Sequence, residues 1–109
     1  MRFATLFLLE ADTAFICEIK RLDVHSANPA DVYSWLHFDK ATQALELLEF
    51  VSMMQAEGEE QRAFRQGHLR FTPTAGTFTD TDGATQALRP LPPEHLPAAL
   101  HAAIERFLR

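Results

Sequence analysis

The chain has 109 residues, of which 47% are apolar and 23% are charged, so its composition is that of one soluble globular domain over residues 1–109. Fifteen acidic and ten basic side chains give a net charge of -5, which argues against nucleic acid or a membrane surface as the partner. No apolar run approaches the ~18 residues that span a bilayer, and acidic residues follow the first apolar run where a signal peptide has its cleavage site. We therefore predict a cytoplasmic protein.

The N-terminal segment predicts a β-hairpin. Residues 3–9 are apolar and aromatic, residues 10–13 have the composition of a turn, and residues 14–22 alternate between the two faces of a strand. Cys17, the only cysteine, lies in the apolar half of this alternation, where a small buried side chain is expected. It has no partner for an intramolecular disulfide, so we expect a reducing compartment.

The segment around Trp35 is compatible with two structures. Asn28 and Pro29 suit the start of a short helix through Trp35, because proline is favoured at the first helical position. The aromatic residues within 32–38 are also typical of a third strand. We favour the strand.

An amphipathic helix is predicted from Asp39, which is a suitable N-cap, through Ala56. At ~100° per residue, the apolar side chains of this segment share one broad face. That face consists of Ala41, Ala44, Leu45, Leu47, Leu48, Val51 and Met54. A helix this apolar covers a sheet and leaves surface for another contact.

The C-terminal part of the chain predicts a second hairpin at residues 67–79, a turn at 80–83 and a short extended piece at 84–88. The proline-rich residues 89–93 lead into a final amphipathic helix at 94–108. The predicted fold class is therefore α+β, with an antiparallel sheet of four to five strands and two amphipathic helices packed on one face. The predicted order of elements is β-β-(β)-α-β-β-α.

The sequence contains no obvious catalytic or metal-binding constellation. The histidines lack metal-ligand spacing, the glycines are scattered rather than gathered in a phosphate-binding loop, and no local base accompanies Cys17. We therefore expect no catalytic residue, metal or cofactor. Methionine and large aromatic side chains recur at binding interfaces. On that basis we predict a partner or dimer interface formed by Trp35, Phe50, Met53 and Met54.

The order of the predicted elements resembles that of the small acidic chaperones of bacterial type III secretion. Four features carry the resemblance: the N-terminal strands, the apolar segment Ala41 to Met54, the hairpin Gly67 to Thr79, and Arg89-Pro90-Leu91-Pro92 before a closing amphipathic helix. The resemblance implies a homodimer built around the middle helix. Such a dimer clasps an extended effector segment and involves neither catalysis nor a cofactor.

Two functions follow from these observations. The first is a non-enzymatic bacterial protein-binding module, acting as a homodimer, that is chaperone-like for a secreted effector or immunity-like for a toxin. Acidic charge and the surplus apolar surface of the middle segment suggest it. The alternative is a small-ligand-binding or small enzymatic α+β domain with an apolar pocket near His25, His37 and Trp35. A cavity lined by those residues favours the alternative, whereas a filled core argues against it.

Overall fold

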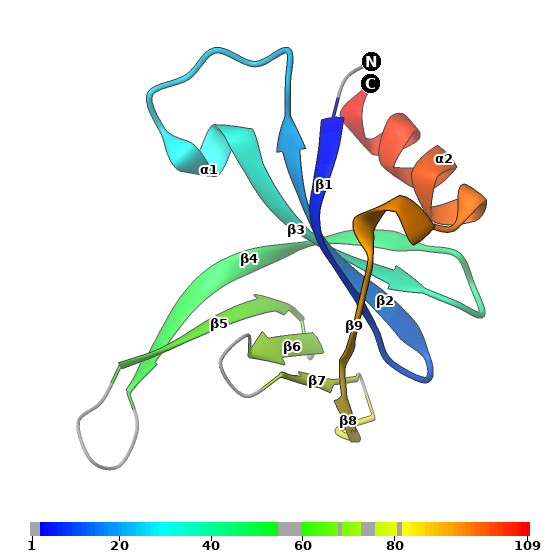
Figure 1. The fold of residues 1–109 in the computed structure, drawn as a ribbon. Helices are drawn as coiled ribbons and strands as arrows, with labels where there is room; N and C mark the ends of the chain where they lie inside the picture. Colours follow the sequence, from blue (N-terminus) through cyan, green and yellow to red (C-terminus); the bar gives the residue numbers. More distant parts are fainter. Residues whose placement is uncertain (1–2, 55–59, 68, 73–75, 81) are drawn as a thin grey trace.

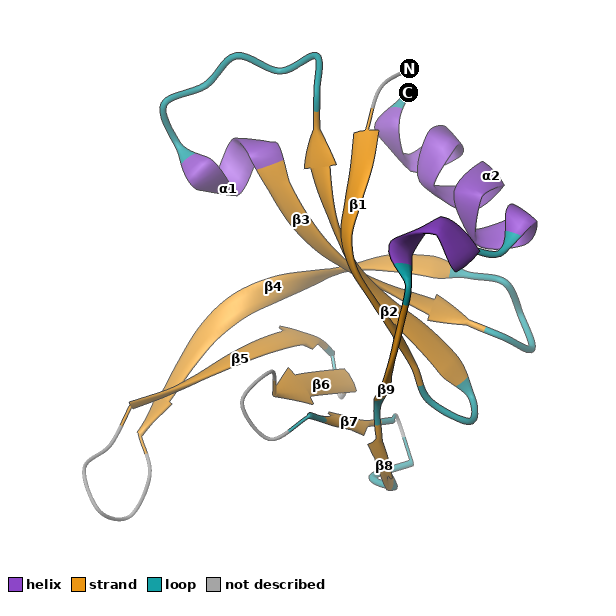
Figure 2. Ribbon diagram, in the orientation of Figure 1, coloured by secondary structure: helices purple, strands orange, loops and turns teal. Residues whose placement is uncertain are grey.

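The computed structural model describes residues 3–54, 60–67, 69–72, 76–80 and 82–109, with the backbone alone at residues 30, 52–54 and 60–62 (Figure 1). Most of the described chain forms antiparallel strands of one sheet, with one long helix beside them (Figure 2). The strands are β1 (Phe3–Glu10), β2 (Ala14–Arg21), β3 (Tyr33–Asp39), β4 (Leu45–Met54), β5 (Glu60–Gln66), β6 (Leu69–Thr72), β7 (Thr77–Thr79), β8 (Thr85–Ala87) and β9 (Arg89–Leu91).

The sheet closes on itself. Its strand order is β8-β7-β6-β5-β4-β3-β2-β1-β9, so strands that follow one another along the chain are neighbours up to the two edges. The edge strands β8 and β9 are separated along the chain by Leu88 alone. The continuous segment 85–91 therefore pairs with β7 through β8 and with β1 through β9. The result is a nearly closed barrel, an architecture that leaves few unpaired strand edges.

Three helical segments accompany the strands: α1 (Pro29–Val32), the 3-10 turn η1 (Pro93–His95) and α2 (Ala98–Leu108). Pro97 is the N-cap residue of α2, a position where the missing N–H removes no intrahelical hydrogen bond. In Figure 1, α2 lies beside the upper part of β1, where it covers the outer face of the sheet. No helix in the described part of the chain has the length and apolar character needed to cross a membrane.

Alternation along the strands divides the buried apolar side chains into two clusters. Cys17 and Ile19 of β2 face α2, whereas the neighbouring Ile16 faces the barrel interior. The helix-side cluster consists of Leu8, Cys17, Ile19, Leu36, Phe38, Leu100, Ala103 and Ile104. The interior cluster consists of Ala11, Ala14, Ile16, Leu48, Leu69, Phe71 and Phe78.

The predicted α+β fold is wrong, because the described part of the helix predicted at residues 39–56, up to Met54, is a turn and a strand. β4 pairs with β3 through its first half and with β5 through its second half. Its apolar spacing imitates a helix because both faces are covered: Leu45 packs against the helix-side cluster and Leu48 belongs to the interior cluster. A strand that is apolar on both faces lacks the alternation by which strands are recognised. A nine-stranded barrel with one long helix therefore replaces the sheet of four to five strands with two helices.

Asp39 makes the hydrogen bonds expected of a helix N-cap, but it makes them in a turn. Its Oδ1 accepts hydrogen bonds from the backbone N–H groups of Ala41 and Thr42 at 2.8 and 2.9 Å. The bond from Thr42 is the main reason that the carboxyl pKa of Asp39 lies below its usual value. Gln43 then adopts a positive φ of 59°, which directs the chain back along β3 as β4.

Other predicted elements are confirmed. The N-terminal hairpin is formed by β1 and β2, and the hairpin at 67–79 contains β6 and β7. The strand favoured around Trp35 is confirmed as β3, whereas the helix considered through Trp35 is limited to α1, which begins at Pro29 and ends at Val32. The final helix begins later than predicted, at Ala98. β5 was not predicted, and the extended lead at residues 89–93 supplies the paired strand β9.

Candidate functional site

A pocket of about 750 Å³ lies where β3 and β4 separate. These strands pair only between Trp35–Phe38 and Leu45–Leu48. On the side of Trp35, β3 comes from α1 while β4 bends away towards β5 (Figure 1). We call this space the diverging-strand pocket. It is lined by Glu18, Arg21, Val24, Pro29, Asp31, Tyr33, Ser34, Trp35, Leu47, Leu48, Glu49, Phe50 and Phe64.

One side of the pocket is built on a cross-strand row that runs over β1 to β4. Residues directly opposite one another on neighbouring strands share a face of the sheet, so the register places their side chains together. The ring of Trp35 stacks on that of Phe7, with centroids 5.9 Å apart and an interplanar angle of 11°. The members of this row are Phe7, Glu18, Trp35 and Leu48.

A second cross-strand row, made of four phenylalanines, continues around the barrel on β4 to β7. Its members are Phe50, Phe64, Phe71 and Phe78. Trp35 joins the two rows, with ring centroids 5.4 Å from Phe64 and 4.9 Å from Phe71. Phe71 and Phe78 are each 1% exposed, whereas Phe50 is 56% exposed. The phenylalanine side chains are therefore buried at one end of the row and exposed at the pocket.

The pocket carries more negative than positive charge. The carboxylates of Glu18, Asp31 and Glu49 are present against the single guanidinium of Arg21. Burial raises the pKa of Glu18, and a side-chain hydrogen bond with Trp35 acts in the opposite direction. The carboxylate therefore lies in surroundings that are less polar than water.

Two of the four residues predicted as an interface line this pocket. Trp35 and Phe50 both contact the ring of Phe64, at centroid distances of 5.4 and 5.7 Å. The side chains of Met53 and Met54 lie outside the described residues, and their backbone belongs to β4 rather than to a helix. The predicted dimer or partner contact stays a prediction.

Of the three residues named for a ligand pocket, only Trp35 lines the diverging-strand pocket. His25 is exposed in the loop before α1. His37 is 5% exposed inside the barrel, stacked on Phe78 beside a separate cavity of about 130 Å³. Burial lowers the pKa of His37, and its Nδ1 has no hydrogen-bond partner among the described residues. A pocket therefore exists near Trp35, but neither histidine lines it.

The thiol of Cys17 lies among the helix-side cluster and is fully buried, as the sequence predicted. Desolvation raises its pKa to about 12, so the reactive thiolate form is suppressed at neutral pH. Within the described residues, no group of three or more His, Cys, Asp or Glu side chains is arranged to hold a metal ion.

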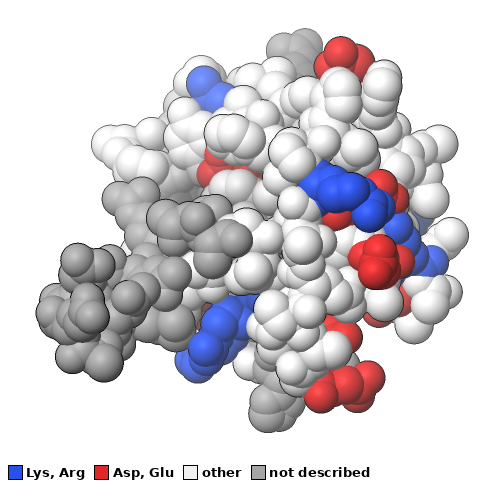
Figure 3. Space-filling view, turned by 60° about the horizontal axis from the view of Figure 1, so that its bottom comes forward, with Lys and Arg blue, Asp and Glu red and all other residues white. Residues whose placement is uncertain are grey.

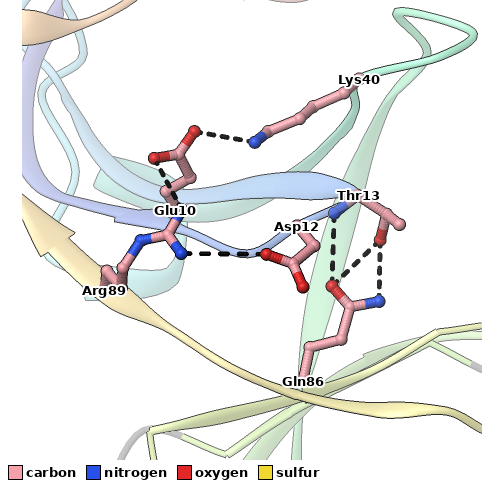
Figure 4. A network of polar contacts seen from close by, with 6 residues as sticks. All are labelled: Glu10, Asp12, Thr13, Lys40, Gln86 and Arg89. Atoms are coloured by element: carbon pink, nitrogen blue, oxygen red, sulfur yellow. Dashed lines mark hydrogen bonds and ion pairs between the residues drawn. The ribbon is translucent and has the colours of Figure 1, made fainter.

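Polar contacts close the barrel at the end remote from the pocket (Figure 4). The Glu10 carboxylate accepts hydrogen bonds from Lys40 Nζ at 2.7 Å and from Arg89 Nη2 at 3.1 Å. These two bonds hold the pKa of Glu10 below its usual value. The Gln86 amide of β8 donates to Thr13 Oγ1 in the β1–β2 turn at 2.9 Å. The network thus ties β1, β8, β9 and the β3–β4 turn together.

On the face drawn in Figure 3, the charged side chains of the described residues lie in small groups rather than in a continuous patch. On the face drawn in Figure 3, basic and acidic groups lie side by side or are separated by uncharged atoms. A surface that binds nucleic acid through its phosphates presents a continuous basic stripe. The described residues of this face present basic side chains as isolated groups only.

Glu18 and Phe64 are pocket residues that sequence analysis missed. Glu18 lies between Cys17 and Ile19 in an alternating segment, where a charged side chain on one face is ordinary and gives no signal of a site. Phe64 lies between the helix predicted to end at Ala56 and the hairpin predicted from Gly67, where the sequence predicted no element. Only the pairing of β5 with β4 brings its ring against Phe50.

The chain matches no protein-family model, no curated protein and no solved structure. The resemblance to the type III secretion chaperones, and the homodimer that it implies, therefore stay predictions. Function has to be inferred from the geometry and chemistry of the pocket.

Proposed function

We propose that the protein binds a small, largely apolar molecule in the diverging-strand pocket. The observation that carries this proposal is a volume of about 750 Å³ beside four aromatic side chains, Tyr33, Trp35, Phe50 and Phe64. Small-molecule sites typically measure ~300–1,000 Å³, are mostly apolar with a few polar groups, and occur in the mouths of β-barrels. The pocket has that size, composition and position.

The distribution of packing supports binding at this end of the barrel. Phe71 and Phe78 fill the interior beyond Trp35, so a ligand enters from the side of Phe50 and stops at the indole. We propose binding without catalysis, because Cys17 and His37 lie outside the pocket. The aromatic walls supply apolar contact area, and the few polar groups orient the ligand.

The test uses Trp35 as an internal reporter, because it is the only tryptophan of the chain. Titration of the full chain with the neutral dye Nile red should raise the dye emission and quench the tryptophan emission in the same concentration range. Phe50→Ala removes one wall of the pocket and should weaken dye affinity about fivefold, which corresponds to about 1 kcal/mol of lost apolar contact.

Leu22→Ala is the matched control, because Leu22 is 51% exposed against 56% for Phe50 but does not line the pocket. Its dye affinity should equal that of the parent protein. Dye binding that leaves Trp35 emission unchanged, or that weakens equally in both variants, would count against a ligand in this pocket.

A protein partner or a second copy of the chain is the second candidate occupant. It is favoured by the exposure of apolar side chains on the pocket rim, 40% for Tyr33, 40% for Leu47 and 56% for Phe50. Sedimentation of the purified chain over a range of concentrations separates the candidates. A dimer whose dissociation follows Phe50→Glu supports the interface, whereas a monomer that binds Nile red supports the ligand pocket.

A further inference from the structure

We infer that the ligand of the diverging-strand pocket is an organic cation with an apolar body, held between the Glu18 carboxylate and the surrounding aromatic rings. The inference rests on the proposed function and adds the charge of the molecule that is bound. It depends on three observations: a carboxylate without an ion-pair partner among the described residues, aromatic side chains that line the same pocket, and a guanidinium that contacts the ring of Phe107.

Glu18 lacks the cationic partners that a comparable carboxylate has. Glu10 is neutralised by Lys40 and Arg89, with nitrogen to oxygen distances of 2.7 and 3.1 Å. Within the described residues, no lysine or arginine nitrogen forms such an ion pair with Glu18, whose hydrogen-bonding neighbour is the uncharged Trp35. A partly desolvated carboxylate attracts a cation more strongly than a solvated one, because its charge is less screened.

The rings around Glu18 favour the same ligand charge. The faces of tryptophan, tyrosine and phenylalanine carry negative electrostatic potential and attract ammonium groups within ~6 Å of the ring centroid. The protein already contains such a contact near the pocket, where Lys20 Nζ lies 5.9 Å from the Tyr33 centroid. Trp35 is opposite Glu18 in the register, so a cation beside the carboxylate also meets the indole.

Arg21 does not reverse this preference. Arg21 also lines the pocket, and its Nε is buried without a hydrogen-bond partner among the described residues. Its guanidinium carbon lies 5.5 Å from the ring centroid of Phe107 on α2, a residue that does not line the pocket, so part of its charge is met by that ring. Asp31 and Glu49 add two carboxylates to the lining. Their charges attract a cation towards the opening before it reaches Glu18.

The experiment compares three probes that share a benzyl group and differ in charge. Benzyltrimethylammonium is a cation, neopentylbenzene is its neutral isostere, and benzylsulfonate is an anion. Each is titrated into the full chain while the single indole N–H resonance of Trp35 is followed by NMR. We expect the cation to bind about tenfold more tightly than its neutral isostere, in line with a desolvated cation–π and carboxylate contact.

Glu18→Gln tests the carboxylate directly, because the amide keeps the shape and an acceptor for Trp35 while removing the charge. The tenfold preference for the cation should fall to about one, and the affinity of neopentylbenzene should stay unchanged. Glu94→Gln, which removes an exposed carboxylate outside the pocket, should keep the preference. The comparison of probes in the parent protein remains decisive even where Glu18→Gln does not fold.

The outcomes separate this inference from the proposed function. If the neutral or anionic probe binds as tightly as the cation or more tightly, the inference of a cationic ligand is wrong, but the proposed ligand binding still stands. If Nile red binds and none of the three benzyl probes does, the inference of a cationic ligand is also wrong. Failure of Nile red and of all three probes to perturb Trp35 overturns both the inference and the proposed function.

Discussion

The helix-side cluster and the barrel interior bury apolar side chains in different ways. The helix-side cluster is largely aliphatic and is sealed by α2, so Leu36, Leu100 and Ile104 are each 0% exposed. The interior cluster combines aliphatic side chains with the buried Phe71 and Phe78, and the phenylalanine row that passes through it ends at the half-exposed Phe50. The same strands contribute to both, because alternate residues point to opposite sides.

This difference suggests that stability and ligand binding depend on different parts of the barrel. A sealed aliphatic cluster stabilises the folded state through burial and close packing, and it leaves no space for a ligand. The cavity beside His37 and Phe78 measures about 130 Å³, whereas the pocket beside Trp35 measures about 750 Å³. We conclude that the helix-side cluster holds the barrel together while the open end of the interior is free to bind.

The largest expected effect tests the helix-side cluster. Leu100→Ala removes a fully buried side chain between α2 and the sheet and should reduce the free energy of unfolding by about 2–5 kcal/mol. Urea denaturation followed by circular dichroism measures the loss. Nile red affinity of the folded protein should not change, because Leu100 lies on the opposite side of the sheet from the pocket.

Leu22→Ala is the control for that measurement, because the same side chain is removed from an exposed position. Its stability should change by no more than about 0.5 kcal/mol. A similar small change in Leu100→Ala would contradict the assignment of stability to the helix-side cluster.

A smaller, pH-dependent effect tests the end of the barrel interior that contains His37. Burial lowers the pKa of His37 below its usual 6.5, against the opposing charges of Glu46 and Asp39. The unfolded chain therefore takes up a proton before the folded chain does as the pH falls. Stability is fully present above pH 6.5 and should be lost on acidification towards the folded pKa, by at most about 1.4 kcal/mol per pH unit.

His37→Leu should remove this part of the acid sensitivity, while the parts that arise from Glu10 and Asp39 remain. His95→Leu, at an exposed position on η1, is the control and should keep the parental slope. The measurement is the urea midpoint between pH 7 and pH 5. Equal slopes in the parent and in His37→Leu would show that the histidine does not contribute.

The sequence predicted β2 correctly although both of its faces carry buried side chains, Ile16 on one and Cys17 on the other. The polar Glu18 and Lys20 preserve an alternation there that is typical of a strand. β4 was misassigned because Leu45 and Leu48 are buried on opposite sides, against different clusters. A covering helix on one side and a barrel interior on the other are tertiary features, and no local pattern encodes them.

The site was predictable only in part, for a related reason. Trp35 and Phe50 were predicted to form part of an interface because they are large aromatic side chains, and both line the pocket. The sequence places them on different elements and does not indicate that Phe64 joins them. Glu18 acquires its significance from its position opposite Trp35, which depends on the β2–β3 register.

Leu88 places the two edge strands on one segment, and this has a consequence for the order of folding. Every other pair of neighbouring strands in the sheet is consecutive along the chain, so these hairpins form quickly from local contacts. The β1–β9 pair instead sets Leu8 opposite Leu91, which requires closing a loop that contains every other strand of the sheet. We expect this pairing to form last, from an open meander. Until it forms, β1 presents an unpaired edge, and that is the stage at which the chain is most exposed to pairing with another copy.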